Sequence, residues 1–155
     1  MVENIQADIS IELFNDLSKN YNLIPIYKVI EKGKKTPVSV YKNLKNHANT
    51  FLLESVEGNK NFARYSFIGF NPNKIIKTGD KEKFKKIDPL NKLEEQLENI
   101  RTPKLEGLPE FNSGAVGFIS YEAVSYFEPS INKIEDQTSY FPESIFFITS
   151  SLIIF

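Results

Sequence analysis

The sequence lacks cysteine and tryptophan altogether, and it has one histidine and one methionine among 155 residues. Without cysteine, a disulfide framework, a thiolate zinc site and a cysteine nucleophile are all excluded. A single histidine, His47, excludes a metal site built from several histidines. No apolar run reaches the length of a membrane span, and the start has no basic cluster followed by an apolar stretch. We therefore expect a cytoplasmic protein with no membrane partner.

The sequence also has no excess of charge of either sign. The 19 basic and 20 acidic side chains give a net charge of −1, which exerts no global attraction on nucleic acid. Residues 74–86 contain a run of lysines, but Phe84 is the only aromatic side chain there that could stack on a base. This run is typical of a solvated face or a protected strand edge, so we expect no nucleic-acid partner.

Three segments carry signals for helices. The first is residues 8–19, where Asp8 or Ser10 can cap a helix. The second begins at Thr36-Pro37 and the third at Asp88-Pro89; in both, a capping side chain precedes a proline whose missing N–H costs nothing at the first helical position. The third continues to residue 100 with the clearest amphipathic spacing of the chain.

Apolar, β-branched runs predict strands between and after these helices. We expect strands over 23–30, 50–56, 63–69, 114–121 and 144–155, with 50–56 and 63–69 forming an antiparallel pair. A second hairpin is expected between 74–77 and 84–87 around Gly79-Asp80, and a helix is expected to start near residue 121. The predicted class is α+β, with mostly antiparallel sheet and flanking helices, as one domain over residues 1–155.

The last run ends on Leu-Ile-Ile-Phe with no turn and no polar tail. Such an apolar strand needs partners, and termini are usually exposed and loosely held. We expect the sequence to be the amino-terminal piece of a longer protein. An intact domain with a buried final strand is the alternative.

No group of residues predicts catalysis. His47 lies in a polar loop, and the glutamates near residue 95 lie on the polar face of their helix. The glycines of 114–117 lack the lysine of a phosphate-binding loop and the spacing of a dinucleotide fingerprint. Glu54 is more informative because it lies inside an apolar strand. It is either a carboxylate with a partner or a strand-edge side chain facing water.

Two blocks of sequence resemble a known family. Residues 51–58 read Phe-Leu-Leu-Glu-Ser-Val-Glu-Gly, and residues 63–69 read Ala-Arg-Tyr-Ser-Phe-Ile-Gly. This pair resembles the amino-terminal region of anthranilate synthase component I, the subunit that makes anthranilate from chorismate. Residues 24–27, 36–41 and 114–122 agree with the family in order and spacing, so the resemblance runs from about residue 10 to the end.

The resemblance implies a fold and assigns different functions to the two halves of the parent sequence. Family members have a stacked α/β/β/α arrangement of mostly antiparallel sheets, in which the two halves of the sequence intertwine. The amino-terminal half carries the feedback site for L-tryptophan and contacts a glutamine amidotransferase subunit, component II. The chorismate site, the Mg²⁺ ligands and the catalytic side chains belong to the carboxy-terminal half. No catalytic residue and no metal ligand therefore map to this chain, which is expected to be inactive alone.

The feedback site maps to the end of the Leu-Leu-Glu-Ser block. The serine beside bound tryptophan corresponds to Ser55, and its neighbours correspond to Glu54 and Val56. A residue that opens the next strand, Arg64, is the fourth expected contact, and Leu53 adds apolar surface. Bound tryptophan needs an apolar slot, acceptors for its ammonium and donors for its carboxylate.

Strand geometry limits this assignment. In a regular strand, Glu54 and Ser55 point to opposite faces, and we expect Ser55 to be the one that faces the ligand. Two other functions stay open: the corresponding part of aminodeoxychorismate synthase component I, and a free-standing amino-acid-binding module.

Overall fold

The computed structural model describes residues 8–44, 46–54, 65–128, 130–131 and 141–155. The helices are α1 (Ile11–Leu17), α2 (Pro37–Asn43), α3 (Pro89–Leu97) and the 3₁₀ helix η1 (Tyr121–Tyr126). The strands are β1 (Phe51–Leu53), β2 (Phe67–Phe70), β3 (Lys74–Thr78), β4 (Gly114–Ile119), β5 (Ser144–Thr149) and β6 (Ser151–Ile154). The α+β class with antiparallel sheets is confirmed.

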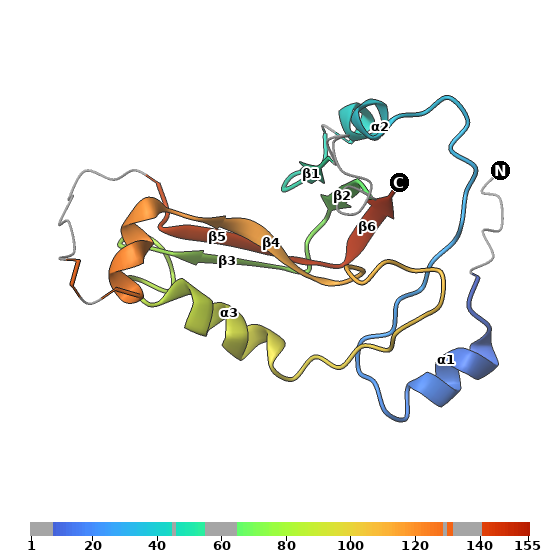
Figure 1. Cartoon of the computed structure of the whole chain (residues 1–155), viewed down its shortest axis with the longest axis horizontal. Helices are drawn as coiled ribbons and strands as arrows, with labels where there is room; N and C mark the ends of the chain where they lie inside the picture. Colours follow the sequence, from blue (N-terminus) through green and yellow to red (C-terminus); the bar gives the residue numbers. More distant parts are fainter. Residues whose placement is uncertain (1–7, 45, 55–64, 129, 132–140) are drawn as a thin grey trace.

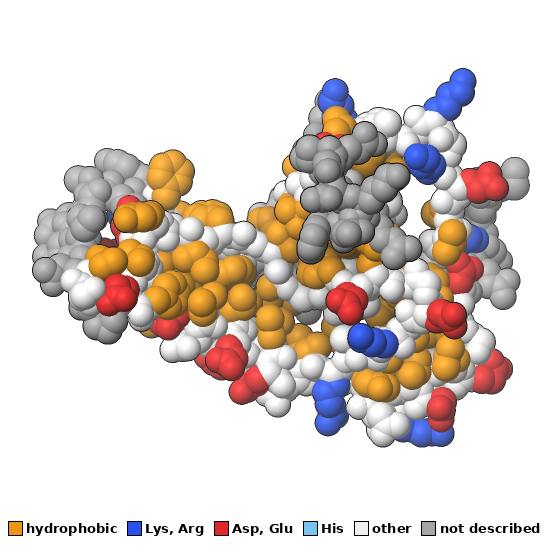
Figure 2. Space-filling view, in the orientation of Figure 1, with side chains coloured by type: hydrophobic (Ala, Val, Ile, Leu, Met, Phe, Trp, Pro, Cys, Tyr) orange, Lys and Arg blue, Asp and Glu red, His pale blue; other side chains and the backbone are white. Residues whose placement is uncertain are grey.

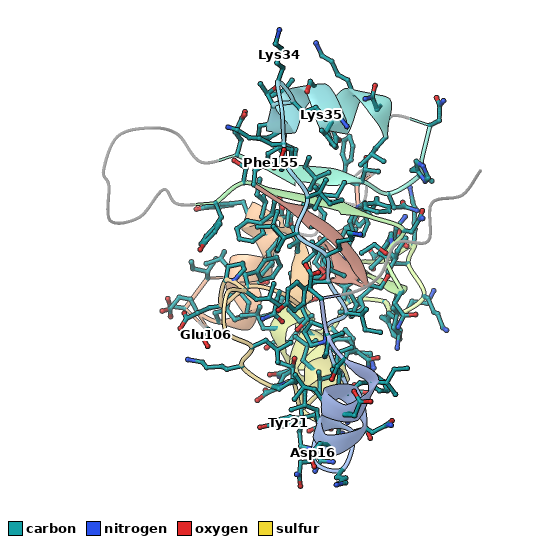
Figure 3. All side chains as sticks on the ribbon, turned by 90° about the vertical axis from the view of Figure 1, so that its right-hand side faces the viewer. Asp16, Tyr21, Lys34, Lys35, Glu106 and Phe155 are labelled. Atoms are coloured by element: carbon teal, nitrogen blue, oxygen red, sulfur yellow. The ribbon has the colours of Figure 1, made fainter. Side chains whose placement is uncertain are left out.

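The strands form two three-stranded antiparallel sheets (Figure 1). The first has the order β1-β2-β6, and the second has the order β3-β5-β4. The second sheet extends as an arm away from the first, with α3 beneath it and η1 at its tip. Helix α2 lies at the top of the molecule and helix α1 at the bottom in both views (Figures 1 and 3).

Local signals at the helix starts are confirmed. Ser10, not Asp8, caps α1, since its hydroxyl accepts from the backbone N–H of Leu13. Thr36 forms a capping box with Ser39 at the start of α2. Asp88 accepts from two backbone N–H groups at the start of α3. These interactions satisfy amide donors that a helix start leaves unpaired.

Two strand predictions were wrong. Residues 23–30 do not join a sheet, and Ile26, Val29 and Ile30 are 66%, 78% and 74% exposed. The strand expected at 74–77 is confirmed as β3, but the predicted hairpin with 84–87 does not form, because β3 pairs with β5. Residues 79–85 instead close on themselves through the bond from the Gly79 N–H to the Lys85 carbonyl. In both cases the local sequence is apolar enough for a strand, but tertiary packing determines whether a segment joins a sheet and with which strand it pairs.

The pair of strands expected from 50–56 and 63–69 is confirmed as β1 and β2, with Phe51 opposite Gly69 and Leu53 opposite Phe67. The expected strand at 114–121 is confirmed as β4. The expected helix after it is the short η1. The final apolar run forms two strands, β5 and β6, separated by Ser150.

The arm buries one face of its sheet. Ile76, Thr78, Phe146 and Ser144 share that face by strand alternation and are all less than 9% exposed. Lys74 lies on the same side and hydrogen-bonds to Gln96 of α3, so α3 covers this face.

The other face of the arm is apolar and only partly covered. Alternation places Ile75, Phe147, Val116 and Phe118 there, and Phe118 is 47% exposed. Figure 2 shows hydrophobic side chains gathered along the arm. Among the described residues, fully buried hydrophobic side chains are few, whereas large exposed ones occur on most elements. Such a surface is typical of a chain that packs against further polypeptide.

A buried hydroxyl pair gives a first testable prediction. Thr78 and Ser144 face each other across β3 and β5, both are 0% exposed, and their hydroxyl oxygens lie 2.8 Å apart. Thr78→Val keeps the shape but leaves the Ser144 hydroxyl without this partner, which we expect to cost about 1–3 kcal/mol of unfolding free energy. Adding Ser144→Ala should recover part of the loss, and denaturant unfolding of the single and double variants measures both. A double variant as unstable as the sum of the two singles would contradict the pairing.

Candidate functional site

The carboxyl end of β1 positions the first of the expected site residues. Leu53 lies opposite Phe67 of β2, which in turn lies opposite Ile154 of β6. Directly opposed residues share one face of a sheet, so these three side chains form a continuous apolar strip. Leu53 is 45% exposed, and the strip is therefore open to a ligand or partner at the β1 edge.

Aromatic rings extend this strip. The ring of Phe111, from the loop before β4, meets the ring of Phe67 edge to face, with centroids 5.2 Å apart and an interplanar angle of 87°. The ring of Tyr65 lies 6.2 Å from the same Phe67 ring. We call Leu53, Tyr65, Phe67, Phe111 and Ile154 the apolar strip. Flat rings at these distances offer edges and faces against which another planar group can pack.

The opposite face of the same sheet is closed. Ile68, in the centre of β2, is 0% exposed, and Phe70 on the same side meets the ring of His47 at 5.9 Å. His47 lies in the connection that follows α2, and α2 contacts both β1 and β2. Within the described residues, the helix therefore covers this face, and the face of the apolar strip is the more open one.

Glu54 follows directly after Leu53 and is exposed. Alternation directs it away from the face of Leu53, so the two residues do not line the same side unless the backbone turns beyond the strand. The exposed position agrees with the strand-edge reading of this carboxylate. Three further expected site residues, Ser55, Val56 and Arg64, lie outside the described residues.

Phe111 and Tyr65 were not among the predicted site residues. Phe111 comes 44 positions after Phe67, in a loop whose sequence shows no periodicity. Only the tertiary fold brings its ring to β2. Tyr65 does lie in the block that carries the family resemblance, so its proximity to Phe67 could be read from the sequence.

The described residues offer no cluster that suits a metal. No group of three or more His, Asp or Glu side chains in these parts of the chain is arranged to hold an ion. The helices among these residues are likewise too short and too polar to cross a bilayer.

Among the titrating groups of the described residues, the most strongly shifted one lies far from the apolar strip, at the tip of the arm (Figure 1). The Tyr126 hydroxyl donates to the Glu143 carboxylate at 2.9 Å. Burial, followed by this hydrogen bond and the charge of Glu143, raises the pKa of Tyr126 well above its ordinary value. The phenol is therefore held neutral as a structural donor rather than prepared to lose its proton.

The hydrogen bond between Tyr126 and Glu143 predicts that the folded protein loses stability at alkaline pH. A neutral phenol favoured by the folded state stabilises it below the unfolded pKa of about 10, and the contribution is lost as pH rises through the range between the unfolded and folded pKa values. The melting temperature of the wild-type protein should therefore fall above about pH 10 more steeply than that of Tyr126→Phe. Tyr121→Phe, which changes a tyrosine that is 81% exposed, serves as the control and should keep the wild-type slope. Equal slopes in all three proteins would contradict the assignment.

Comparisons with known proteins bear directly on the family. No family model matches the chain. The chain is 41% identical over 135 residues to a Schizosaccharomyces pombe protein named probable anthranilate synthase component 1, covering 86% of this chain and 26% of that protein. It is 35% identical over 161 residues to anthranilate synthase component 1 of Saccharomyces cerevisiae, covering 97% of this chain and 31% of the yeast protein.

The chain is related to anthranilate synthase component I. A bacterial anthranilate synthase component 1, from Acetivibrio thermocellus, is 32% identical over 149 residues. A crystal structure of anthranilate synthase component I from Streptococcus pneumoniae matches with a TM-score of 0.46 and 28% identity, covering 83% of this chain and 29% of that one. The sequence identity to the three named relatives confirms the resemblance inferred from the Leu-Leu-Glu-Ser block. The chain spans between 26% and 31% of the length of these relatives.

Proposed function

We propose that this chain is the amino-terminal part of an anthranilate synthase component I. The parent protein would be a lyase of tryptophan biosynthesis that converts chorismate, with glutamine or ammonia, into anthranilate and pyruvate. The observation that carries the proposal is sequence identity of 32–41% across 86–97% of this chain to proteins with that name. The exposed apolar face of the arm supports a chain that packs against further polypeptide.

Within that parent, this part has a regulatory and structural role and is inactive alone. The proposed effector is L-tryptophan, bound where β1 ends, by Ser55 together with Leu53, Glu54, Val56 and Arg64. The described geometry supports this place because the apolar strip is open beside Leu53 and presents aromatic rings to a flat indole. The ammonium and carboxylate of the effector need charged or hydrogen-bonding partners, which the polar members of this set supply.

The same proposal includes one protein partner and a cofactor outside this chain. A glutamine amidotransferase subunit, component II, would deliver ammonia and contact this part of the parent. Mg²⁺ and chorismate would be bound by the carboxy-terminal half of the parent, in the cytoplasm. No step of the reaction is assigned to a residue of this chain.

Product analysis of the full-length protein that carries this chain tests the proposal. Incubation with chorismate, Mg²⁺ and an ammonium salt should yield anthranilate and pyruvate in equal amounts. Aminodeoxychorismate without pyruvate would instead identify the related synthase. The purified 155 residues should yield neither product, and anthranilate formed by them would contradict the assignment of catalysis to the other half.

Titration of the full-length enzyme with L-tryptophan tests the effector role. Anthranilate formation should fall with increasing L-tryptophan, and L-phenylalanine at the same concentrations should inhibit much less because it lacks the indole. An enzyme that makes anthranilate and ignores tryptophan would keep the enzymatic assignment and refute the feedback site.

A further inference from the structure

Two stretches of backbone, each made of two successive strands, pass from one sheet into the other. β2 is followed by β3 along one path, and β5 is followed by β6 along the other, so the two paths form a single bent ladder (Figure 1). Phe70 pairs with Ser151 and Lys74 pairs with Ile148. Three residues on the first path therefore face two on the second. An extra residue on one strand bends a ladder and increases its twist.

The extra residue is accommodated at Asn71. Its φ of 46° lies in the left-handed region, which asparagine tolerates better than other side chains that carry a Cβ. Pro72 follows and has no N–H to donate. The ladder resumes when the Asn73 N–H donates to the Ile148 carbonyl at 3.0 Å. The interruption is thus confined to two residues on one strand.

Side chains hold this junction in place. The Ser150 hydroxyl donates to the Asn71 carbonyl at 2.8 Å across the bend. The Asn71 side-chain oxygen lies 3.4 Å from Nδ1 of His47, which belongs to the connection between α2 and β1. The Thr149 hydroxyl donates to the Gly114 carbonyl at 3.0 Å and so ties the start of β4 to the same place. Both sheets are therefore fastened to one short stretch of backbone.

The remaining two strands each belong to one sheet and do not connect the two. β1 pairs only within the first sheet and β4 only within the second. Among the described strands, the bent ladder is therefore the route by which a movement of the first sheet reaches the second. Hinges of this kind are a few residues at the ends of elements that absorb a change in φ and ψ.

We propose that the junction of Asn71 and Ser150 is a hinge between the two sheets, and that the Ser150–Asn71 hydrogen bond sets the angle between them. Effector binding at the end of β1 acts on the rest of the protein through this hinge, a second step that rests on the function proposed above. Allosteric coupling needs a two-state element that both sites bias, and the bend supplies one candidate inside the described fold.

The hinge itself is tested by a distance between the sheets, which needs no assumption about function. Spin labels are placed at Lys42→Cys on α2 and at Glu94→Cys on α3, the helix that covers the second sheet; both positions are exposed. The labels are introduced in the full-length protein after any cysteine outside these 155 residues is replaced. Ser150→Ala should shift and broaden the distance distribution, and Asn71→Gly, which frees the backbone at the bend, should broaden it further. Ser18→Ala removes an exposed hydrogen bond of the same 2.8 Å length, from the Ser18 hydroxyl at the end of α1 to the Asn15 carbonyl, and it should leave the distribution unchanged. An unchanged distribution in both junction variants would overturn the hinge.

The link to the effector is tested on the same proteins. L-Tryptophan should shift the wild-type distance, and Ser150→Ala should change the tryptophan concentration for half-maximal inhibition by about 2- to 30-fold while turnover without tryptophan is retained. If the wild type is not inhibited at all, the proposed function fails and the distances alone decide the hinge. If the wild type is inhibited and Ser150→Ala responds identically in both distance and inhibition, the hinge fails while the function stands.

Discussion

Gly117→Ala is expected to destabilise the fold by about 3 kcal/mol or more, the largest stability effect of any single methyl group added here. Gly117 pairs with Phe146 in the centre of the arm. A Cβ at this position would overlap the carbonyl oxygen of Ile145 and come within 2.8 Å of the Phe146 Cα. These are backbone atoms of the central strand, so they cannot rotate away as a side chain can. The strands must separate or the ladder must break.

Two other glycines serve as comparisons for this prediction. The three atoms nearest to a Cβ at Gly69 all belong to the ring of Phe51, a side chain that can move, so Gly69→Ala should cost less and should be partly rescued by Phe51→Leu. Gly33 has a φ of 55° and nothing within 4 Å of an added Cβ, so Gly33→Asn meets no overlap and should cost only the left-handed backbone strain, about 1 kcal/mol, which asparagine tolerates better than most side chains. Denaturant unfolding ranks the three variants. A stable Gly117→Ala protein would show that β4 and β5 do not pair in this register.

The helix starts could be predicted from the sequence because their causes are local. A capping side chain acts on N–H groups two or three residues away, and proline fixes its own φ, so Thr36-Pro37 and Asp88-Pro89 needed no knowledge of the rest of the fold. Strand pairing has no such local cause. β3 pairs with β5, and Lys74 lies opposite Ile148, a partner that no nearby turn signal indicates.

The same distinction between local and tertiary causes applies to the residues of the candidate site. The face on which Leu53 lies follows from the register of β1 and β2, which the sequence predicted as an antiparallel pair. The approach of Phe111 to Phe67 depends on a loop far along the chain and could not be predicted. Ser55, Val56 and Arg64 were assigned from the family resemblance, and these assignments stay predictions.

Ser55→Phe is expected to raise the L-tryptophan concentration for half-maximal inhibition of the full-length enzyme by about 5- to 150-fold, the range that corresponds to loss of a typical coupling free energy of 1–3 kcal/mol. Ser55 comes two residues after Leu53, so a strand that kept its alternation would place it on the face of the apolar strip. A phenyl group there would occupy the space proposed for the indole and would remove the hydroxyl. Anthranilate formation without tryptophan should be retained, because the catalytic groups are assigned to the other half of the parent.

Two further variants separate loss of binding from a general disturbance of the sheet. Ser55→Ala removes only the hydroxyl, and we expect it to raise the same concentration by about 2- to 13-fold, which is the worth of one hydrogen bond. Ser18→Phe adds the same phenyl group to an exposed position directly after α1, which lies at the bottom of the molecule whereas α2 lies at the top, and it should leave inhibition unchanged. If Ser55→Phe is inhibited at the wild-type tryptophan concentration, the effector does not bind at the end of β1. The apolar strip would then be a packing surface for the rest of the parent protein, because its exposed Leu53 and aromatic rings would still need apolar side chains to cover them.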